Sequence, residues 1–152
     1  MIVCDKRLLE RIENGELSVI EKKRYFICQI AEKALGDIPI FYSSQPQGTD
    51  IPAVFVRIGK MQYKKRLGDE IECEVRFEAR FLPKNSNDDI FCEAVMEKLM
   101  DALIANEISK ISSERTKTGA VINADCDLRW IVEPDDSGDE LMRILDMQKD
   151  EI

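Results

Sequence analysis

Apolar and charged residues alternate along residues 71–81 more regularly than anywhere else in the chain. The apolar set is Ile71, Cys73, Val75, Phe77, Ala79 and Phe81, and the charged set between them is Glu72, Glu74, Arg76, Glu78 and Arg80. Successive side chains of a β-strand point to opposite faces. A helix would spread the same charges around its circumference and bury several of them without partners, at considerable cost. The pattern therefore predicts a strand whose apolar side chains are buried and whose charged side chains are exposed.

Three further segments have strand patterns. Residues 38–43 are short, apolar and bounded by turn residues, and residues 53–58 are apolar at both alternating sets, as in a strand covered on both faces. Residues 61–67 extend this second strand past Gly59 to a hairpin turn at Gly68-Asp69. Residues 120–132 repeat the half-exposed alternation, so we expect them to form a final strand that pairs with residues 71–81. The pattern does not decide whether this strand is continuous or broken near Asp125.

Helical spacing accounts for most of the remaining apolar residues. Asp5 is placed to cap a short helix that ends at Asn14-Gly15, and Ser18 and Glu21 have the spacing of a capping box for a longer helix that Gly36 ends. After a loop over residues 83–89, a second long helix is expected to run to about Asn106. Its expected buried stripe comprises Ile90, Phe91, Ala94, Val95, Leu99, Ala102 and Leu103.

These segments predict one α+β domain over residues 1–152. We expect a mainly antiparallel sheet of about four to five strands, with two long amphipathic helices packed on one face. Residues 1–17 are expected to form an N-terminal helical extension, and residues 139–152 a C-terminal arm whose apolar residues fit a helix or a strand. A chain of 152 residues can bury a core without disulfides or a structural metal.

The composition excludes several functional classes. Thirty acidic and 22 basic residues give a net charge of −8, which repels nucleic acid and anionic membranes at long range, so we expect no specific nucleic-acid binding. The apolar runs are too short for a membrane span and the N-terminus has no export signal, so the cytoplasm is the expected compartment. The five scattered cysteines and the lack of histidine fit neither a zinc site nor a disulfide framework, and predict buried, reduced thiols.

Candidate catalytic residues are few. Without histidine the commonest general base is missing, and no glycine-rich phosphate loop is present. Carboxylates that could hold a hard divalent cation occur in Asp125-x-Asp127, Asp135-Asp136 and Glu72-x-Glu74. Acids mixed with arginines at alternate positions are also typical of a solvated strand face, and we favour that interpretation. We therefore expect no enzymatic activity, no cofactor and no bound metal.

The densest basic group, Lys60, Lys64, Lys65 and Arg66, lies near the expected hairpin turn of an acidic chain. Such a group is commonly a solvated hairpin end, and the alternative is a contact with an acidic surface on a neighbouring copy or a partner. Trp130 is in phase with the apolar side of its strand, which favours a core position over an interface. The interface hypothesis comprises Tyr63, Lys64, Lys65, Arg66, Glu72, Glu74, Arg76, Glu78 and Arg80.

Two segments resemble the tail terminator family of phages and prophages from Gram-positive bacteria. Residues 47–58 read Gln-Gly-Thr-Asp-Ile-Pro-Ala-Val-Phe-Val-Arg-Ile, similar to that family's Gln-Gly, spacer, Pro and aromatic-aliphatic strand. Residues 77–83 read Phe-Glu-Ala-Arg-Phe-Leu-Pro, similar to its strand ending, which an Asn/Asp-rich loop and an amphipathic helix follow. The chain departs from the pattern at Leu82, where an aromatic residue is common, and in the charged segment before Ser18.

The resemblance implies a structural protein that forms a hexameric ring on the last ring of the tail tube. It would stop tube polymerisation and join the tail to the head, with itself, the tail tube protein and the head-tail connector protein as partners. The charged face of residues 72–80 could line the lumen of the ring or form its lateral contact. Such a protein would be made in the host cytoplasm from a prophage gene and then become part of the virion. The alternatives are a small cytosolic ligand- or protein-binding module and a metal-dependent nuclease that uses Asp125, Asp127 or Glu74.

Overall fold

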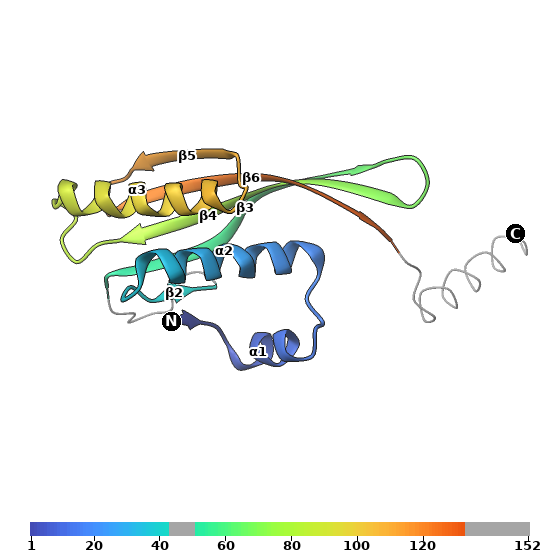
Figure 1. The fold of residues 1–152 in the computed structure, drawn as a ribbon, viewed down its shortest axis with the longest axis horizontal. Helices are drawn as coiled ribbons and strands as arrows, with labels where there is room; N and C mark the ends of the chain where they lie inside the picture. Colours follow the sequence, from blue (N-terminus) through green and yellow to red (C-terminus); the bar gives the residue numbers. More distant parts are fainter. Residues whose placement is uncertain (43–50, 133–152) are drawn as a thin grey trace, which may run out of the picture.

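A computed structural model describes residues 1–42 and 51–132 of the chain. In chain order its elements are β1 (Ile2–Val3), α1 (Lys6–Glu13), α2 (Val19–Leu35), β2 (Ile40–Phe41), β3 (Ala53–Lys65), β4 (Glu70–Leu82), α3 (Asp89–Ala105), β5 (Lys110–Arg115) and β6 (Ala120–Ile131) (Figure 1). The fold is α+β, as predicted. The expected C-terminal arm, residues 139–152, lies outside the described residues.

The strands form one mixed sheet in the order β1-β2-β3-β4-β6-β5. The pairs β3–β4, β4–β6 and β6–β5 are antiparallel, and the predicted pairing of β4 with β6 is confirmed without a break at Asp125. β1 and β2 instead join the edge of β3 in parallel, so the sheet is mixed and has six strands, whereas a mainly antiparallel sheet of about four to five strands was expected. β1 has only two residues, too few to show periodicity, and β5 is an edge strand whose mostly exposed side chains lack an apolar set.

Side-chain caps fix the start of each helix where the sequence predicted it. The Asp5 carboxylate accepts a hydrogen bond from the Leu8 amide (2.7 Å), and the Ser18 hydroxyl accepts one from the Glu21 amide (3.2 Å). Asp88 accepts one from the Phe91 amide in the same way (3.1 Å). Gly36 ends α2 with a φ of +56°, a conformation that favours glycine.

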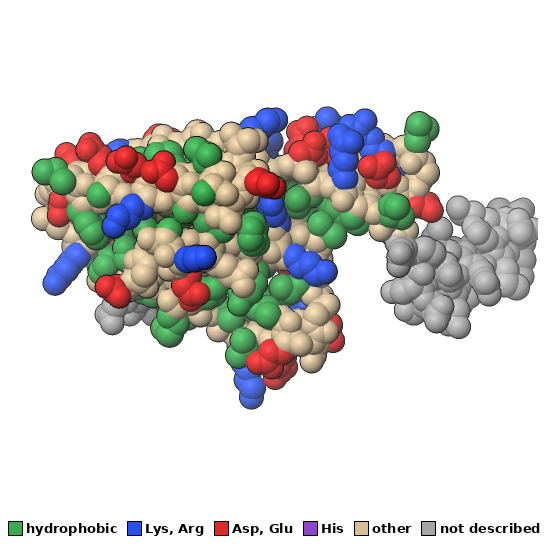
Figure 2. Space-filling model, viewed as in Figure 1, with side chains coloured by type: hydrophobic (Ala, Val, Ile, Leu, Met, Phe, Trp, Pro, Cys, Tyr) green, Lys and Arg blue, Asp and Glu red, His purple; other side chains and the backbone are tan. Residues whose placement is uncertain are grey.

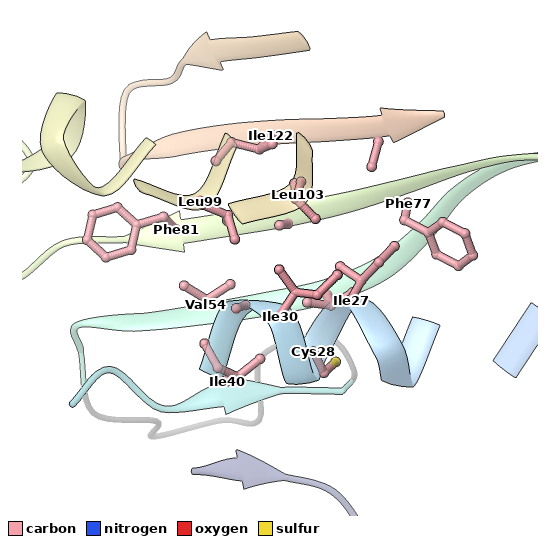
Figure 3. Packing of buried hydrophobic residues seen from close by; sticks show 14 of the residues in the cluster. Ile27, Cys28, Ile30, Ile40, Val54, Phe77, Phe81, Leu99, Leu103 and Ile122 are labelled. Carbon is pink, nitrogen blue, oxygen red and sulfur yellow. The ribbon is translucent and has the colours of Figure 1, made fainter. Parts of the chain in front are cut away.

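The two long helices, α2 and α3, cover the same face of the sheet, as predicted (Figure 1). Between helices and sheet lies one core, to which α2 contributes Ile27 and Ile30, α3 contributes Leu99 and Leu103, and β4 contributes Phe77 (Figure 3). The apolar set of β4 is buried from Cys73 to Phe81, while Ile71 is half-buried. The predicted register of this strand is therefore confirmed for its apolar side.

The buried face of α3 differs from the predicted stripe. Cys92, Val95, Met96, Leu99 and Leu103 face the core. Of the residues expected there, Ile90 is 83% exposed, and Phe91 and Ala94 are also exposed. The helix is apolar around much of its circumference, so periodicity permits more than one stripe. The position of the sheet and of α2 selects one, and leaves aliphatic side chains on the outer face of the helix.

The sheet extends beyond the helices as a narrow three-stranded projection. A 17-residue helix spans about 26 Å, whereas β3 and β4, with 13 residues each, span about 43 Å. A bulge at Gly59 marks the start of this projection, which comprises residues 60–76 and residues 126–131 of β6 and is called the ribbon below (Figure 1). Cys73 and Val75, at the base of the ribbon, are still buried. Trp130 lies here, half-buried against Tyr63, with the two rings edge to face and their centroids 5.9 Å apart.

Phe77 offers a test of the core. Its side chain is 1% exposed, so Phe77→Ala should lower the free energy of unfolding by about 3–5 kcal/mol through lost burial and an unfilled cavity. Urea denaturation with an unchanged slope would measure this loss. The control Ile90→Ala, at an exposed position, should change stability by less than about 0.5 kcal/mol. A loss below about 1 kcal/mol at Phe77 would contradict the assigned core.

Candidate interface on the sheet and the ribbon

The sheet face opposite the helices carries most of the charged residues that the sequence singled out. Directly opposed residues of paired strands share a face. Across β3 and β4 the opposed pairs are Arg57 with Glu78, Gln62 with Glu74 and Lys64 with Glu72. On the other side of β4, β6 places Asp125 opposite Arg76, Asp127 opposite Glu74 and Arg129 opposite Glu72. The structure therefore brings Lys64 together with Glu72, Glu74, Arg76, Glu78 and Arg80.

Ion pairs within the chain neutralise much of this face. Two nitrogens of Arg76 donate to the two carboxylate oxygens of Asp125 (2.7 and 3.1 Å), and this hydrogen bonding lowers the pKa of Asp125. Arg57 Nε lies 2.6 Å from a carboxylate oxygen of Glu78. Lys64 Nζ lies 3.7 Å from Glu74. Exposed pairs of this kind contribute about 0–1 kcal/mol each to stability. These charges therefore already have partners in the subunit.

The prediction that the charged side of β4 is exposed is wrong at Glu72, because this side chain is only 3% exposed. Arg66, from the hairpin turn, forms a close ion pair with it, and Nη2 of Arg129 on β6 lies 3.7 Å from its other oxygen. Long arginine side chains can cover a neighbour while their charged ends stay in water. Arg66 and Glu72, both part of the interface hypothesis, therefore stabilise the ribbon itself.

The pKa of Glu72 reflects two opposing effects. Burial would raise it, but the hydrogen bond and charge of Arg66, together with the charge of Arg129, outweigh burial, so the pKa is lowered. The carboxylate is thus ionised in the folded protein and joins the turn, β4 and β6.

Tyr63 and Lys65 lie on the other face of the ribbon. Met61, Tyr63 and Lys65 stand opposite Val75, Cys73 and Ile71, on the side that the helices cover elsewhere in the sheet. Tyr63 is 56% exposed, and Leu67 at the turn is 97% exposed. A cavity of about 280 Å³ near the tip is lined by Tyr63, Lys65, Ile71 and Val132, among others. The interface hypothesis named Tyr63 but did not include this apolar surface as a whole, although Met61 and Tyr63 continue the alternation of β3.

A second, polar cavity lies where β5 begins, beside the point at which β6 loses its outer neighbour. It measures about 490 Å³ and is lined by both charge types, including Lys23, Lys110, Arg76 and Asp125. Within residues 1–42 and 51–132 no group of three Cys, Asp or Glu side chains is arranged to hold a metal ion. Of the carboxylates proposed for a nuclease, Asp125 lies 2.7 Å from Arg76 and Asp127 lies 3.9 Å from Arg129. Glu74 lies 3.7 Å from Lys64. Asp135 and Asp136 lie outside the described residues.

The five cysteines are all unpaired, and Cys28, Cys73 and Cys92 are buried. Burial raises the pKa of the Cys28 thiol to about 12, and that of Cys73 is also raised by burial. The thiolate is the reactive form of cysteine, so neither residue is set up as a nucleophile. Of the helices in the described segments, none is long and apolar enough to cross a membrane.

Comparison with known proteins gives one family. Residues 24–140 match the family model described as phage tail terminator protein. The matched range includes β3, β4, α3, β5 and β6, and therefore the whole ribbon, while β1 and α1 precede it. No curated protein matches the chain.

The Glu72 cluster predicts a pH-dependent contribution to stability. A carboxylate whose pKa is lowered by folding stabilises the protein above its unfolded pKa, and this contribution is lost as the pH falls through the folded pKa. Glu72→Gln should therefore lower the melting temperature at pH 7, and the difference from the wild type should narrow only below the usual glutamate pKa of 4.5. Glu74→Gln, which alters an exposed pair, is the matched control with a small effect throughout. A Glu72→Gln difference that is the same at every pH would contradict the assigned ion pairs.

Proposed function

Because the chain belongs to the phage tail terminator protein family, we propose that its copies close into a ring on the end of the tail tube. The ring, with six copies, stops polymerisation of the tube and presents a surface to the head-tail connector protein. The observation that carries this proposal is the family match over residues 24–140, which spans the entire ribbon. No covalent chemistry is required of the subunit.

A closed ring needs a heterologous contact, in which two different surfaces of the same subunit meet and the rotation between copies closes. The ribbon supports such a contact because it extends past the helices and exposes large apolar side chains, among them Met61, Tyr63 and Leu67. Exposed apolar surface of this kind is typical of interaction sites.

The interface hypothesis is accordingly narrowed. We retain Tyr63, Lys64 and Lys65 as the residues that contact a neighbouring copy. Arg66 and Glu72 are assigned to the stability of the ribbon, because they form its buried ion pair. Glu74, Arg76, Glu78 and Arg80 lie on the charged face, for which we propose the lumen of the ring, since their charges are largely balanced within the sheet.

A prophage strain without this gene tests the proposal. Its tails should have irregular lengths and fail to join heads, because nothing would stop the tube or contact the connector. Electron microscopy of induced lysates would measure tail length and the fraction of tails that carry heads. The same strain supplied with the wild-type gene on a plasmid is the control. Tails of normal length joined to heads in the deletion strain would refute the proposed function.

A further inference from the structure

The two ends of the described structure differ in the charged side chains that they expose. Figure 2 shows acidic side chains over α3 at one end, and a group of basic side chains with acidic ones among them over the ribbon at the other. Within the ribbon, Lys60, Lys64, Lys65 and Arg66 precede the turn, although the chain as a whole has a net charge of −8. Of these four, Arg66 forms an ion pair with Glu72, and Lys64 forms a longer, exposed ion pair with Glu74 (3.7 Å).

The outer face of α3 has the complementary pattern. Ile90, Ala94, Glu97, Asp101 and Ile104 recur at steps of four, three, four and three, which places them on one stripe, and all five are exposed. Glu93 adjoins the stripe, and Lys98 is the one basic residue of the helix. Among the described residues, the ion pair on α3 joins Asp89 to Arg115 (2.6 Å) and leaves the middle of the stripe acidic. The stripe is thus acidic at its centre, with Ile90 and Ile104 near its ends.

The tip of the ribbon presents the same arrangement with the opposite charge. Tyr63, Lys65 and Leu67 follow one another along β3 and into the turn, so a cation lies between two exposed apolar side chains. Lys64 adds a second cation at the tip, on the opposite, charged face of the ribbon. Apolar contacts surrounded by complementary charges are the usual composition of a specific protein interface.

These two surfaces cannot meet within one subunit, because α3 covers the end of the sheet remote from the tip of the ribbon (Figure 1). We propose that the ribbon tip of one copy docks on the outer face of α3 of the next copy. This inference rests on the proposed function, since the occupant is a second copy in the ring. The contact joins two different patches, so each copy can bind a neighbour on either side, as closure of a ring requires.

Charge exchange between the two patches tests this docking. One variant carries Lys64→Glu and Lys65→Glu, and leaves Arg66 to hold Glu72. A second variant carries Glu93→Lys and Glu97→Lys on α3. Either variant alone places like charges against each other at the contact, so the fraction of head-joined tails in the complemented deletion strain should fall at least about tenfold. The control Lys22→Glu with Lys33→Glu, at exposed positions of α2, reverses two lysines elsewhere and should leave this fraction unchanged.

Expression of both variants together should restore tail joining, because each reversed ribbon then meets a reversed α3 face. A single chain with all four substitutions should restore it as well. Circular dichroism and unchanged melting temperatures would establish that the variants fold. Normal tails with either variant alone, or a failure of the combination to restore joining, would overturn the docking proposal. The second outcome would indicate that the patches contact the tube or connector protein. The deletion strain tests the proposed function separately, since normal tails there would refute both.

Discussion

Burial of one side of β4 beneath α2 and α3 is the interaction on which the rest of the structure depends. β4 lies between β3 and β6 and pairs with both along nearly its whole length. Its apolar residues from Cys73 to Phe81 are buried, and both helices contribute to the same core. A slip of one residue in this register would move every apolar side chain of β4 to the charged face, so packing and pairing specify each other.

The ribbon follows from the different lengths of helix and strand. Because α2 and α3 end before β3 and β4 do, strand residues near the tip are covered by other side chains of the ribbon, among them arginines and aromatics. Glu72 with Arg66, and Trp130 with Tyr63, supply such cover. The outer strand edges of the ribbon are unpaired along residues 60–65 and 126–131 in the described sheet. Lysines on an exposed edge discourage unspecific strand pairing, so the basic residues of the tip are compatible with solubility as well as with selective docking.

The charges on this face of the sheet are neutralised more fully than the sequence of β4 alone indicates. Along β4 alone, four glutamates and two arginines look like an incompletely neutralised series. In the sheet, Arg57 of β3 and Asp125 of β6 complete pairs with Glu78 and Arg76. Charges with partners inside the subunit contribute little to an additional interface unless those partners are displaced. The exposed apolar residues beside Lys65, which has no ion pair within residues 1–42 and 51–132, are for this reason the stronger candidates for contacts between copies.

The sequence by itself determined the helix boundaries, the β3–β4 hairpin and the register of β4, because capping residues, turn glycines and alternation act over a few neighbouring positions. It also placed the candidate interface near the hairpin end, through the cluster of lysines before Gly68. Only the tertiary structure decided the parallel addition of β1 and β2, the stripe of α3 that faces the core, and the burial of Glu72. Each of these depends on residues far apart in the chain, such as Arg129 above Glu72 or the sheet beneath α3. Local periodicity carries no information about which of several permitted faces such distant partners will cover.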